Sequence, residues 1–303
     1  MRWLASIIMR GRMQAIAVTA VSAVLSLLIP LLSLLSGAAV GLVTLRQGYR
    51  AGLQIIAASA LAVAALELAL GSTPLYGLAL VFVLWLPVWV LAISQRRTAS
   101  QGRSLGLALL FGAMLIVGLH LLTDDPAAWW LERLQSLTQA AAKADGLDVP
   151  GDTSVLGDIA ALMTGVFGAM VSLNLFICLL LARWWQALLY NPGGFRDEFH
   201  ALRLGRNIAV GAGVMALLAG FGSGMPQALA QDLMMLFSVA FAVQGLAVTH
   251  SLIRYRKASV GWLIGVYVLL LFPITMTQTV LTLALGGLVD NWFDFRQRFA
   301  KSG

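Results

Sequence analysis

The sequence is poor in charge and in cysteine. Of its 303 residues, 11% are charged and 60% are hydrophobic, and the one cysteine is Cys178. A single cysteine excludes an intrachain disulfide and a cysteine-ligated zinc site. A soluble domain of this length could not bury so much apolar surface in one core, so lipid must serve as the solvent. Because the apolar runs are about 15 to 30 residues long, we expect helices rather than barrel strands.

Two sequence signatures of enzymes are also missing. The chain contains no H-E-x-x-H and no Walker A lysine loop. Its three histidines, His120, His200 and His250, do not have the spacing of metal ligands. We therefore expect no catalysis, no metal site and no cofactor.

Two long apolar runs are broken by proline, 13–45 at Pro30 and 258–288 at Pro273. Each run is too long for one crossing of the bilayer and barely long enough for two. If each forms a hairpin, the chain has these apolar segments: 13–29, 31–45, 51–70, 76–94, 104–122, 158–182, 207–224, 229–253, 258–272 and 274–288. The sequence thus predicts an all-α integral membrane protein, a polytopic helical bundle with proline-broken hairpins at both ends. About eight to ten membrane segments form one domain over 1–303, and thin crossings and re-entrant hairpins both fit the terminal runs.

The basic residues predict the orientation of this domain. With two terminal hairpins and an internal N-terminus, only Arg133 and Lys143 of the 20 lysines and arginines fall outside. This distribution obeys the positive-inside rule, whereas a single crossing for each proline-broken run violates it. We expect both termini in the cytoplasm and no nucleic-acid partner. The basic start also fits a cleaved secretion signal, but the apolar run continues to Leu45 and favours a retained span.

Three segments outside the spans differ in composition from the apolar runs, namely the outer loop, the C-terminal segment and one internal loop. The outer loop 123–157 is acidic, and Thr123 to Pro126 followed by Trp129 and Trp130 predicts a capped short helix at the outer interface. The C-terminal segment 289–303 alternates aromatic and charged residues, which predicts a second interfacial segment.

The internal loop 183–206 combines aromatic residues with arginines and a turn at Asn191 to Gly194. Two interpretations stay open, an amphipathic elbow on the membrane surface and a docking surface for a cytoplasmic partner protein. The residues that would form that docking surface are Trp184, Trp185, Tyr190, Phe195 and Phe199.

Three phrases of the sequence carry a family resemblance. They are RWWQALLYNPGGFRDEFHALRLGR from Arg183, GLVDNWFDFRQRF from Gly287 and LVTLRQGYRAGL from Leu42. They resemble the YybS-like family of multi-pass bacterial membrane proteins. The resemblance implies a location in the bacterial cytoplasmic (inner) membrane and a distant fold similarity to the substrate-binding subunits of vitamin-type uptake transporters. It implies no catalytic residues.

Ionisable residues inside membrane spans are costly and therefore point to function. Glu67, His120 and Asp232 lie a few residues from the outer ends of their segments, and Asp158 opens the sixth segment. Together they predict a shallow outward vestibule that binds a cationic solute or relays protons. The alternative is that each side chain reaches the headgroups or caps a helix.

Small polar residues form a stripe on each terminal hairpin. Thr275, Gln278, Thr279 and Thr282 share one helical face, as do Thr19, Ser22 and Ser26. We predict a substrate-binding cavity between the first and last hairpins, with Asn174 and Gln244 as further lining residues. The alternative is hydrogen bonding between helices, or to the i−4 carbonyl of the same helix.

Glycine pairs four residues apart predict close helix contacts, within one chain or in a dimer. The pairs are Gly37/Gly41, Gly48/Gly52, Gly102/Gly106, Gly220/Gly224 and Gly261/Gly265. Taken together, the sequence favours a multi-pass protein that binds or transports a small-molecule solute among membrane lipids. The alternative is a non-transporting scaffold that recruits cytoplasmic partners.

Overall fold

The computed structural model describes residues 1–145 and 153–300, which form helices and no strand. The first half contains α1 (Arg2–Arg10), α2 (Arg12–Leu25), α3 (Leu32–Gln47), α4 (Tyr49–Ala69), α5 (Leu75–Ala79), the π-helix η1 (Leu80–Trp85), α6 (Leu86–Thr98), α7 (Gln101–Leu122) and α8 (Pro126–Asp145). The second half contains α9 (Thr153–Tyr190), α10 (Gly194–His200), α11 (Arg206–Phe221), α12 (Gly224–Tyr255), α13 (Gly261–Leu271), α14 (Pro273–Phe293) and α15 (Phe295–Ala300). The prediction of an all-α bundle is confirmed.

Five helical segments of the described chain are long and apolar enough to cross a membrane. They are Tyr49–Ala69, Leu75–Thr98, Gln101–Leu122, Ser154–Tyr190 and Gly224–Tyr255. Four shorter apolar helices, α2, α3, α11 and α13, accompany them. Every apolar segment that the sequence predicts lies largely on a helix. The large apolar side chains left exposed include Leu28, Leu122 and Phe221, which suit contact with lipid.

Both terminal runs form hairpins, as predicted. Helices α2 and α3 pack against each other, and Pro30 lies in the turn between them. Helices α13 and α14 also pack together, and Pro273 is the first residue of α14. The preceding residue, Phe272, has φ −90° and ψ 122°, the extended conformation that a following proline favours.

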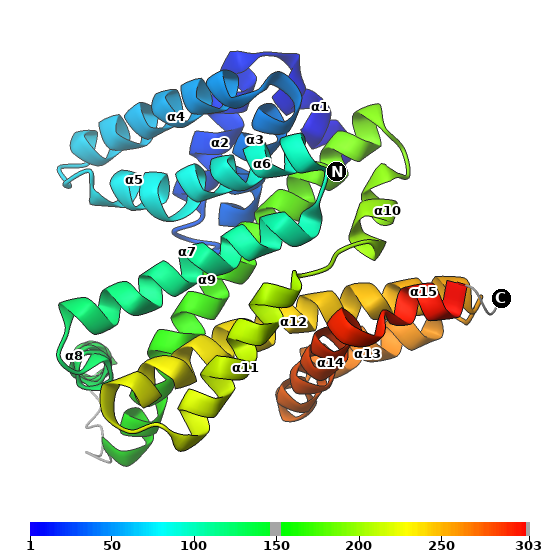
Figure 1. Ribbon diagram of the computed structural model, residues 1–303. Coiled ribbons are helices and arrows are strands. Elements are labelled where there is room, and N and C mark those ends of the chain that lie inside the picture. Colours follow the sequence, from blue (N-terminus) through cyan, green and yellow to red (C-terminus); the bar gives the residue numbers. More distant parts are fainter. Residues whose placement is uncertain (146–152, 301–303) are drawn as a thin grey trace.

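Helix α9 is the central element of the bundle. It is 38 residues long and contacts α3, α6, α7, α8 and α12. Figure 1 shows α1 to α6 on one side of α7 and α9, and α11 to α14 on the other side. The two terminal hairpins therefore lie on opposite sides of this helix pair.

Glycine permits two close helix crossings. A Cβ added at Gly245 of α12 would lie 1.9 Å from the carbonyl oxygen of Leu283, and one added at Gly287 of α14 would lie 2.1 Å from that of Phe241. Where α7 meets α9, a Cβ at Gly112 would lie 2.6 Å from the carbonyl oxygen of Gly168. Such short separations require residues without side chains.

Basic residues tie several helix ends together at one end of the molecule. Arg96 donates to the carbonyl of Leu45 at 3.2 Å, which joins α6 to α3. Arg183 of α9 donates through Nε to Glu198 of α10 at 2.9 Å. Three further hydrogen bonds lie at this end. Arg254 of α12 donates to Asp197 of α10 at 2.8 Å. Arg296 of α15 donates to the carbonyls of His200, the last residue of α10, and of Leu202, at 2.7 Å each. We call this end the basic end.

Asp290 anchors the C-terminal part at the basic end. Its side chain is fully buried and accepts from Arg296 Nη2 at 2.8 Å and from the backbone N–H of Phe295 at 3.1 Å. Gln244, also fully buried, donates to the carbonyl of Gly287 at 2.7 Å and accepts from the N–H of Leu204 at 2.7 Å. Gln244 is thus a bridge between helices and not part of a cavity wall.

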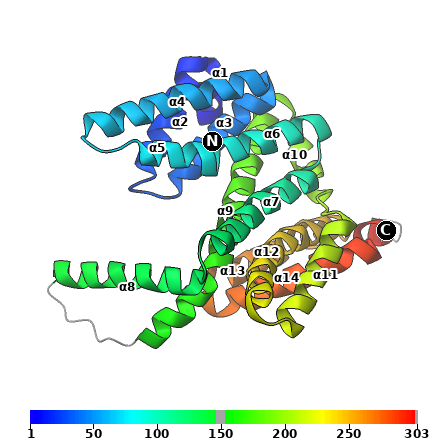
Figure 2. The same cartoon turned by 60° about the vertical axis from the view of Figure 1, so that its left-hand side comes forward.

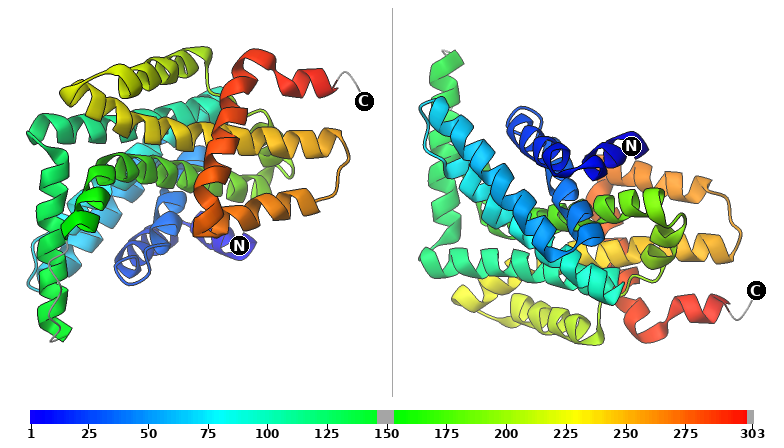
Figure 3. Two further views of the ribbon diagram at one scale, coloured as in Figure 1. Left: turned by 90° about the horizontal axis from the view of Figure 1, so that it is seen from below. Right: turned by 90° about the horizontal axis from the view of Figure 1, so that it is seen from above.

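The segments predicted outside the spans contain α8, the end of α9, α10 and α15, together with short non-helical stretches. Asp125 caps α8 by accepting from the N–H groups of Ala127 and Ala128 at 2.9 and 3.1 Å, and Pro126 is the first helical residue. Helix α8 projects from the bundle in Figure 2, and it lies on the side opposite α15 in both views of Figure 3. Residues 146–152 of the outer loop and 301–303 of the C-terminal segment lie outside the described residues.

Candidate functional site

Two residues singled out from the sequence, Glu67 and Ser26, hold Tyr76. The carboxylate of Glu67 accepts from the backbone N–H groups of Tyr76 and Gly77, each at 3.0 Å. These donors belong to the first turn of α5, where no helical partner exists. Ser26 Oγ lies 2.6 Å from the Tyr76 hydroxyl, which also donates to the carbonyl of Ala23 at 2.7 Å. Tyr76 thereby joins the first hairpin to α5.

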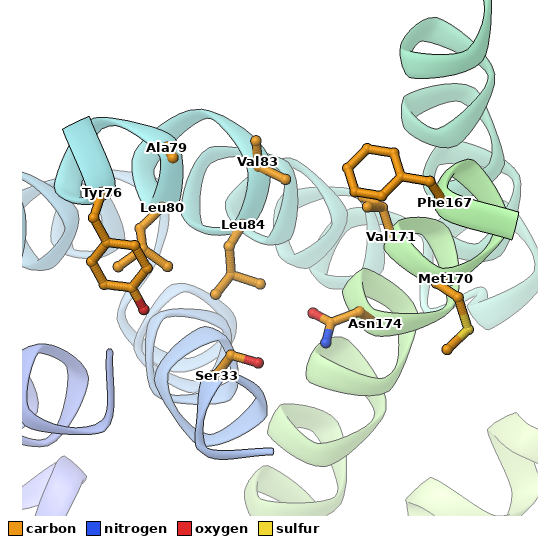
Figure 4. A pocket seen from close by; sticks show the side chains of 10 residues that line it. All are labelled: Ser33, Tyr76, Ala79, Leu80, Val83, Leu84, Phe167, Met170, Val171 and Asn174. Carbon is orange, nitrogen blue, oxygen red and sulfur yellow. The ribbon is translucent and has the colours of Figure 1, made fainter. Parts of the chain in front are cut away.

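Tyr76 lines a cavity of about 390 Å³ between α3, α5, η1 and α9. Its lining residues are Ser33, Tyr76, Ala79, Leu80, Val83, Leu84, Phe167, Met170, Val171 and Asn174, shown in Figure 4. We call it the α3–α9 cavity. Its walls are apolar apart from Ser33, Tyr76 and Asn174, and none of its lining residues carries an ionised side chain.

Asn174 is the polar group with the most unused hydrogen-bonding capacity in this cavity. Figure 4 shows its amide directed toward the space between η1 and α3. The Cys178 thiol approaches its Oδ1 at 3.8 Å, and the described residues offer no hydrogen bond to its Nδ2. By contrast, the Ser33 hydroxyl already donates to the carbonyl of Pro30 at 2.7 Å. An amide in apolar surroundings gains stability when a ligand supplies the missing partner.

The π-helix η1 forms one wall of the α3–α9 cavity. It contributes Leu80, Val83 and Leu84. Trp85, at its last position, is fully buried and donates to Ser36 Oγ at 2.9 Å, which fixes η1 against α3. Short π-helical turns within α-helices are frequent at functional sites because they alter the direction of neighbouring side chains. The sequence does not indicate a role for Tyr76 or η1, since hydropathy periodicity does not distinguish a π-helical turn from an α-helical one.

His120 and Asp232 form a buried pair elsewhere in the bundle. His120 Nε2 of α7 lies 2.7 Å from Asp232 Oδ2 of α12, and the two side chains are 4% and 9% exposed. Gly165 of α9 passes close by, since a Cβ there would lie 2.9 Å from the Asp232 Cα. The predicted vestibule of four ionisable residues is therefore wrong. Glu67 caps α5 in the other part of the bundle, and Asp158 is exposed near the start of α9.

The polar stripe of the last hairpin lines a hollow of its own. Thr275, Gln278, Thr279 and Thr282 line about 340 Å³ of space between α13 and α14. The hydroxyls of Thr279 and Thr282 donate to the carbonyls of Thr275 and Gln278, each at 2.7 Å. These bonds match the alternative interpretation, in which threonine bonds its own helix.

The residues of the first stripe lie far from those of the last. Ser22 is partly buried on α2, and Thr19 is fully buried there. Because α7 and α9 separate the two hairpins in Figure 1, the prediction of one cavity between them is wrong. Hydropathy, the proline positions and the basic residues together predict hairpins at both ends of the chain, but they do not say whether the two hairpins touch.

Most aromatic residues of the 183–206 loop are buried or pack against other side chains of the protein. Trp185 is fully buried, and Trp184 is partly buried. Phe199 packs edge-on against His250 with ring centroids 5.6 Å apart, and Phe195 stacks on Phe199. Tyr190 is exposed and carries the Arg46 guanidinium 4.2 Å from its ring centroid.

These features define the class of the protein as an all-α, multi-pass membrane protein. No family model, no curated protein and no solved structure matches the chain. The resemblance to the YybS-like family stays a prediction.

Proposed function

We propose that this chain is a solute-binding protein of the bacterial cytoplasmic membrane, with both termini in the cytoplasm, and that the α3–α9 cavity holds the solute. The observation that carries the proposal is the Asn174 amide, which faces an apolar space of about 390 Å³. Ligand sites typically combine apolar walls with a few convergent polar groups. Transport of the bound solute is the extension of this proposal that the sequence favours.

The lining of the cavity favours a neutral, mainly apolar solute. A charged ligand would have to leave water without a charged partner, because the lining residues include no ionised side chain. Asn174 and Tyr76 suit a hydroxyl or carbonyl on such a ligand. Phe167 and Met170 are 44% and 59% exposed, which leaves a route into the cavity from the surrounding lipid.

A photoreactive probe tests the proposal. We expect a neutral long-chain alcohol with a diazirine to label α9 and η1 saturably in phosphatidylcholine nanodiscs, with adducts mapped by mass spectrometry. Val83→Trp should abolish the labelling because the indole fills the cavity. Asn174→Leu should weaken probe binding roughly fivefold to tenfold, as expected for the loss of one hydrogen bond.

The matched control for Val83→Trp is Leu78→Trp. Leu78 is 51% exposed on α5 and does not line the α3–α9 cavity, so labelling should persist. Labelling that cannot be saturated, or that is equal in all three variants, would contradict a specific solute site.

The scaffold alternative has weaker support. Of the aromatic residues that would form its docking surface, Trp185 is fully buried, and Phe199 is partly buried with its ring against His250. A cytoplasmic partner would have mainly Tyr190 and the polar residues of α10 to contact.

A further inference from the structure

A second and larger cavity lies at the basic end, on different walls from the α3–α9 cavity. It has a volume of about 500 Å³ and lies between α9, α10, α12 and α13. Its apolar walls include Leu173, Ile177 and Leu180 of α9 and Leu246 of α12. We call it the α10 cavity, because α10 covers its end. The α9 residues alone extend about 10 Å along the helix, from Leu173 to Leu180.

The polar residues of the α10 cavity come from three different helices. Arg196 and His200 belong to α10, His250 to α12 and Tyr267 to α13. The His200 and His250 ring centroids are 6.2 Å apart, and His250 Nε2 lies 3.0 Å from the Tyr267 hydroxyl. Burial lowers the pKa of His200, as do the nearby His250, Arg254 and Arg196. At neutral pH the His200 ring therefore serves as a hydrogen-bonding group, and arginine supplies the fixed charge.

Arg196 differs from the arginines around it. Arg183, Arg203, Arg254 and Arg296 each have a carboxylate partner within 3.0 Å. The guanidinium of Arg196 has no hydrogen bond or ion pair within residues 1–145 and 153–300, although the side chain is exposed at the cavity. The two acidic residues of α10 are already bonded, Asp197 to Arg254 and Glu198 to Arg183. The charge at the mouth of the cavity is thus positive and unbalanced.

We propose that the α10 cavity binds an acidic membrane lipid, with its phosphate at Arg196, His200 and His250 and one acyl chain along α9 and α12. Charge complementarity selects the headgroup, because arginine forms paired hydrogen bonds to phosphate. The apolar walls on α9 and α12 favour an amphiphile over free phosphate, because an acyl chain can cover these walls and a free anion cannot. Because the basic end is the predicted cytoplasmic one, the lipid comes from the inner leaflet, where anionic headgroups attract basic segments.

Lipid titration of the purified protein tests this site. Phosphatidylglycerol should raise the thermal unfolding midpoint in neutral detergent, whereas phosphatidylcholine should bind at least tenfold more weakly, and inorganic phosphate should give no shift. A diazirine on the acyl chain of phosphatidylglycerol should label α9 or α12. Arg196→Gln should weaken the binding of phosphatidylglycerol about tenfold and remove the preference of the protein for it over phosphatidylcholine. Ile177→Trp should abolish binding of both lipids by filling the cavity.

Arg97→Gln is the matched control, because Arg97 is an exposed arginine of α6 outside the α10 cavity. Its affinity for phosphatidylglycerol should equal that of the unchanged protein. Equal losses for Arg97→Gln and Arg196→Gln would overturn the proposal in favour of attraction to the whole basic surface. Stabilisation by phosphate alone, or adducts away from α9 and α12, would also overturn it. Midpoints without lipid identify any variant that fails to fold.

Discussion

Gly287→Ala is expected to cost about 3 kcal/mol of unfolding free energy, at the upper end of the range for overpacked interiors. The new methyl group would lie 2.1 Å from the carbonyl oxygen of Phe241 and 2.7 Å from the backbone nitrogen of Gly245. These are backbone atoms of α12, so the contact can be relieved only if α12 and α14 move apart. Gly245→Ala should cost a similar amount, because its methyl would lie 1.9 Å from the carbonyl oxygen of Leu283. SDS titration in mixed micelles measures both losses.

Gly286→Ala provides the control one residue away. A Cβ there has open space, with no atom within 4 Å. Alanine has a higher helix propensity than glycine, so this variant should be as stable as the unchanged protein or slightly more stable. If Gly286→Ala and Gly287→Ala lose equal stability, the close crossing of α12 and α14 is not the cause.

Removing one partner of the His120–Asp232 pair is expected to cost about 3 kcal/mol, because it leaves the other polar group buried without its bond. The pair joins α7 to α12 at 2.7 Å, and both side chains are less than a tenth exposed. His120→Leu and Asp232→Val should therefore each destabilise the protein strongly. The double variant should lose about 4 kcal/mol, less than the sum of the two single losses, since two apolar side chains can pack together.

A double-mutant cycle measures this coupling. The expected interaction free energy is about 2 kcal/mol, and the unfolding of all four proteins is followed in the same micelles. Additive losses in the double variant would show that the two side chains act independently, against the direct bond. Solute binding in the α3–α9 cavity should be unchanged in the folded double variant, because the pair does not line that cavity.

The element order is largely predictable from the sequence because membrane helices are defined by the length of apolar runs. Pro30 and Pro273 divided the terminal runs into hairpins, and the structure has a turn at each proline. The cap of α8 and the turn before α10 were also predicted, since aspartate, proline and glycine have strong local preferences.

The spatial neighbours were harder to predict. Gly37 and Gly41 do meet α9, at Cys178 and Ala182, whereas Gly220 and Gly224 face open space. The closest crossing pairs Gly245 with Gly287, which no spacing within one helix reveals. For the same reason, the sequence identified Glu67, Ser26 and Asn174 as polar residues in spans but did not indicate that all three gather around Tyr76 and its cavity.

Thiol labelling in intact cells tests the central claim, that the bundle crosses the membrane with its basic end in the cytoplasm. In a Cys178→Ser background, single cysteines replace four exposed residues in helix-connecting turns or at the ends of helices beside them: Gln47, Ser72, Ser223 and Ser259. We predict that a membrane-impermeant maleimide labels Ser72→Cys and Ser223→Cys from outside, and labels Gln47→Cys and Ser259→Cys only after the cells are opened. Labelling of Gln47→Cys or Ser259→Cys in intact cells would contradict the orientation and the inner-leaflet source of the lipid.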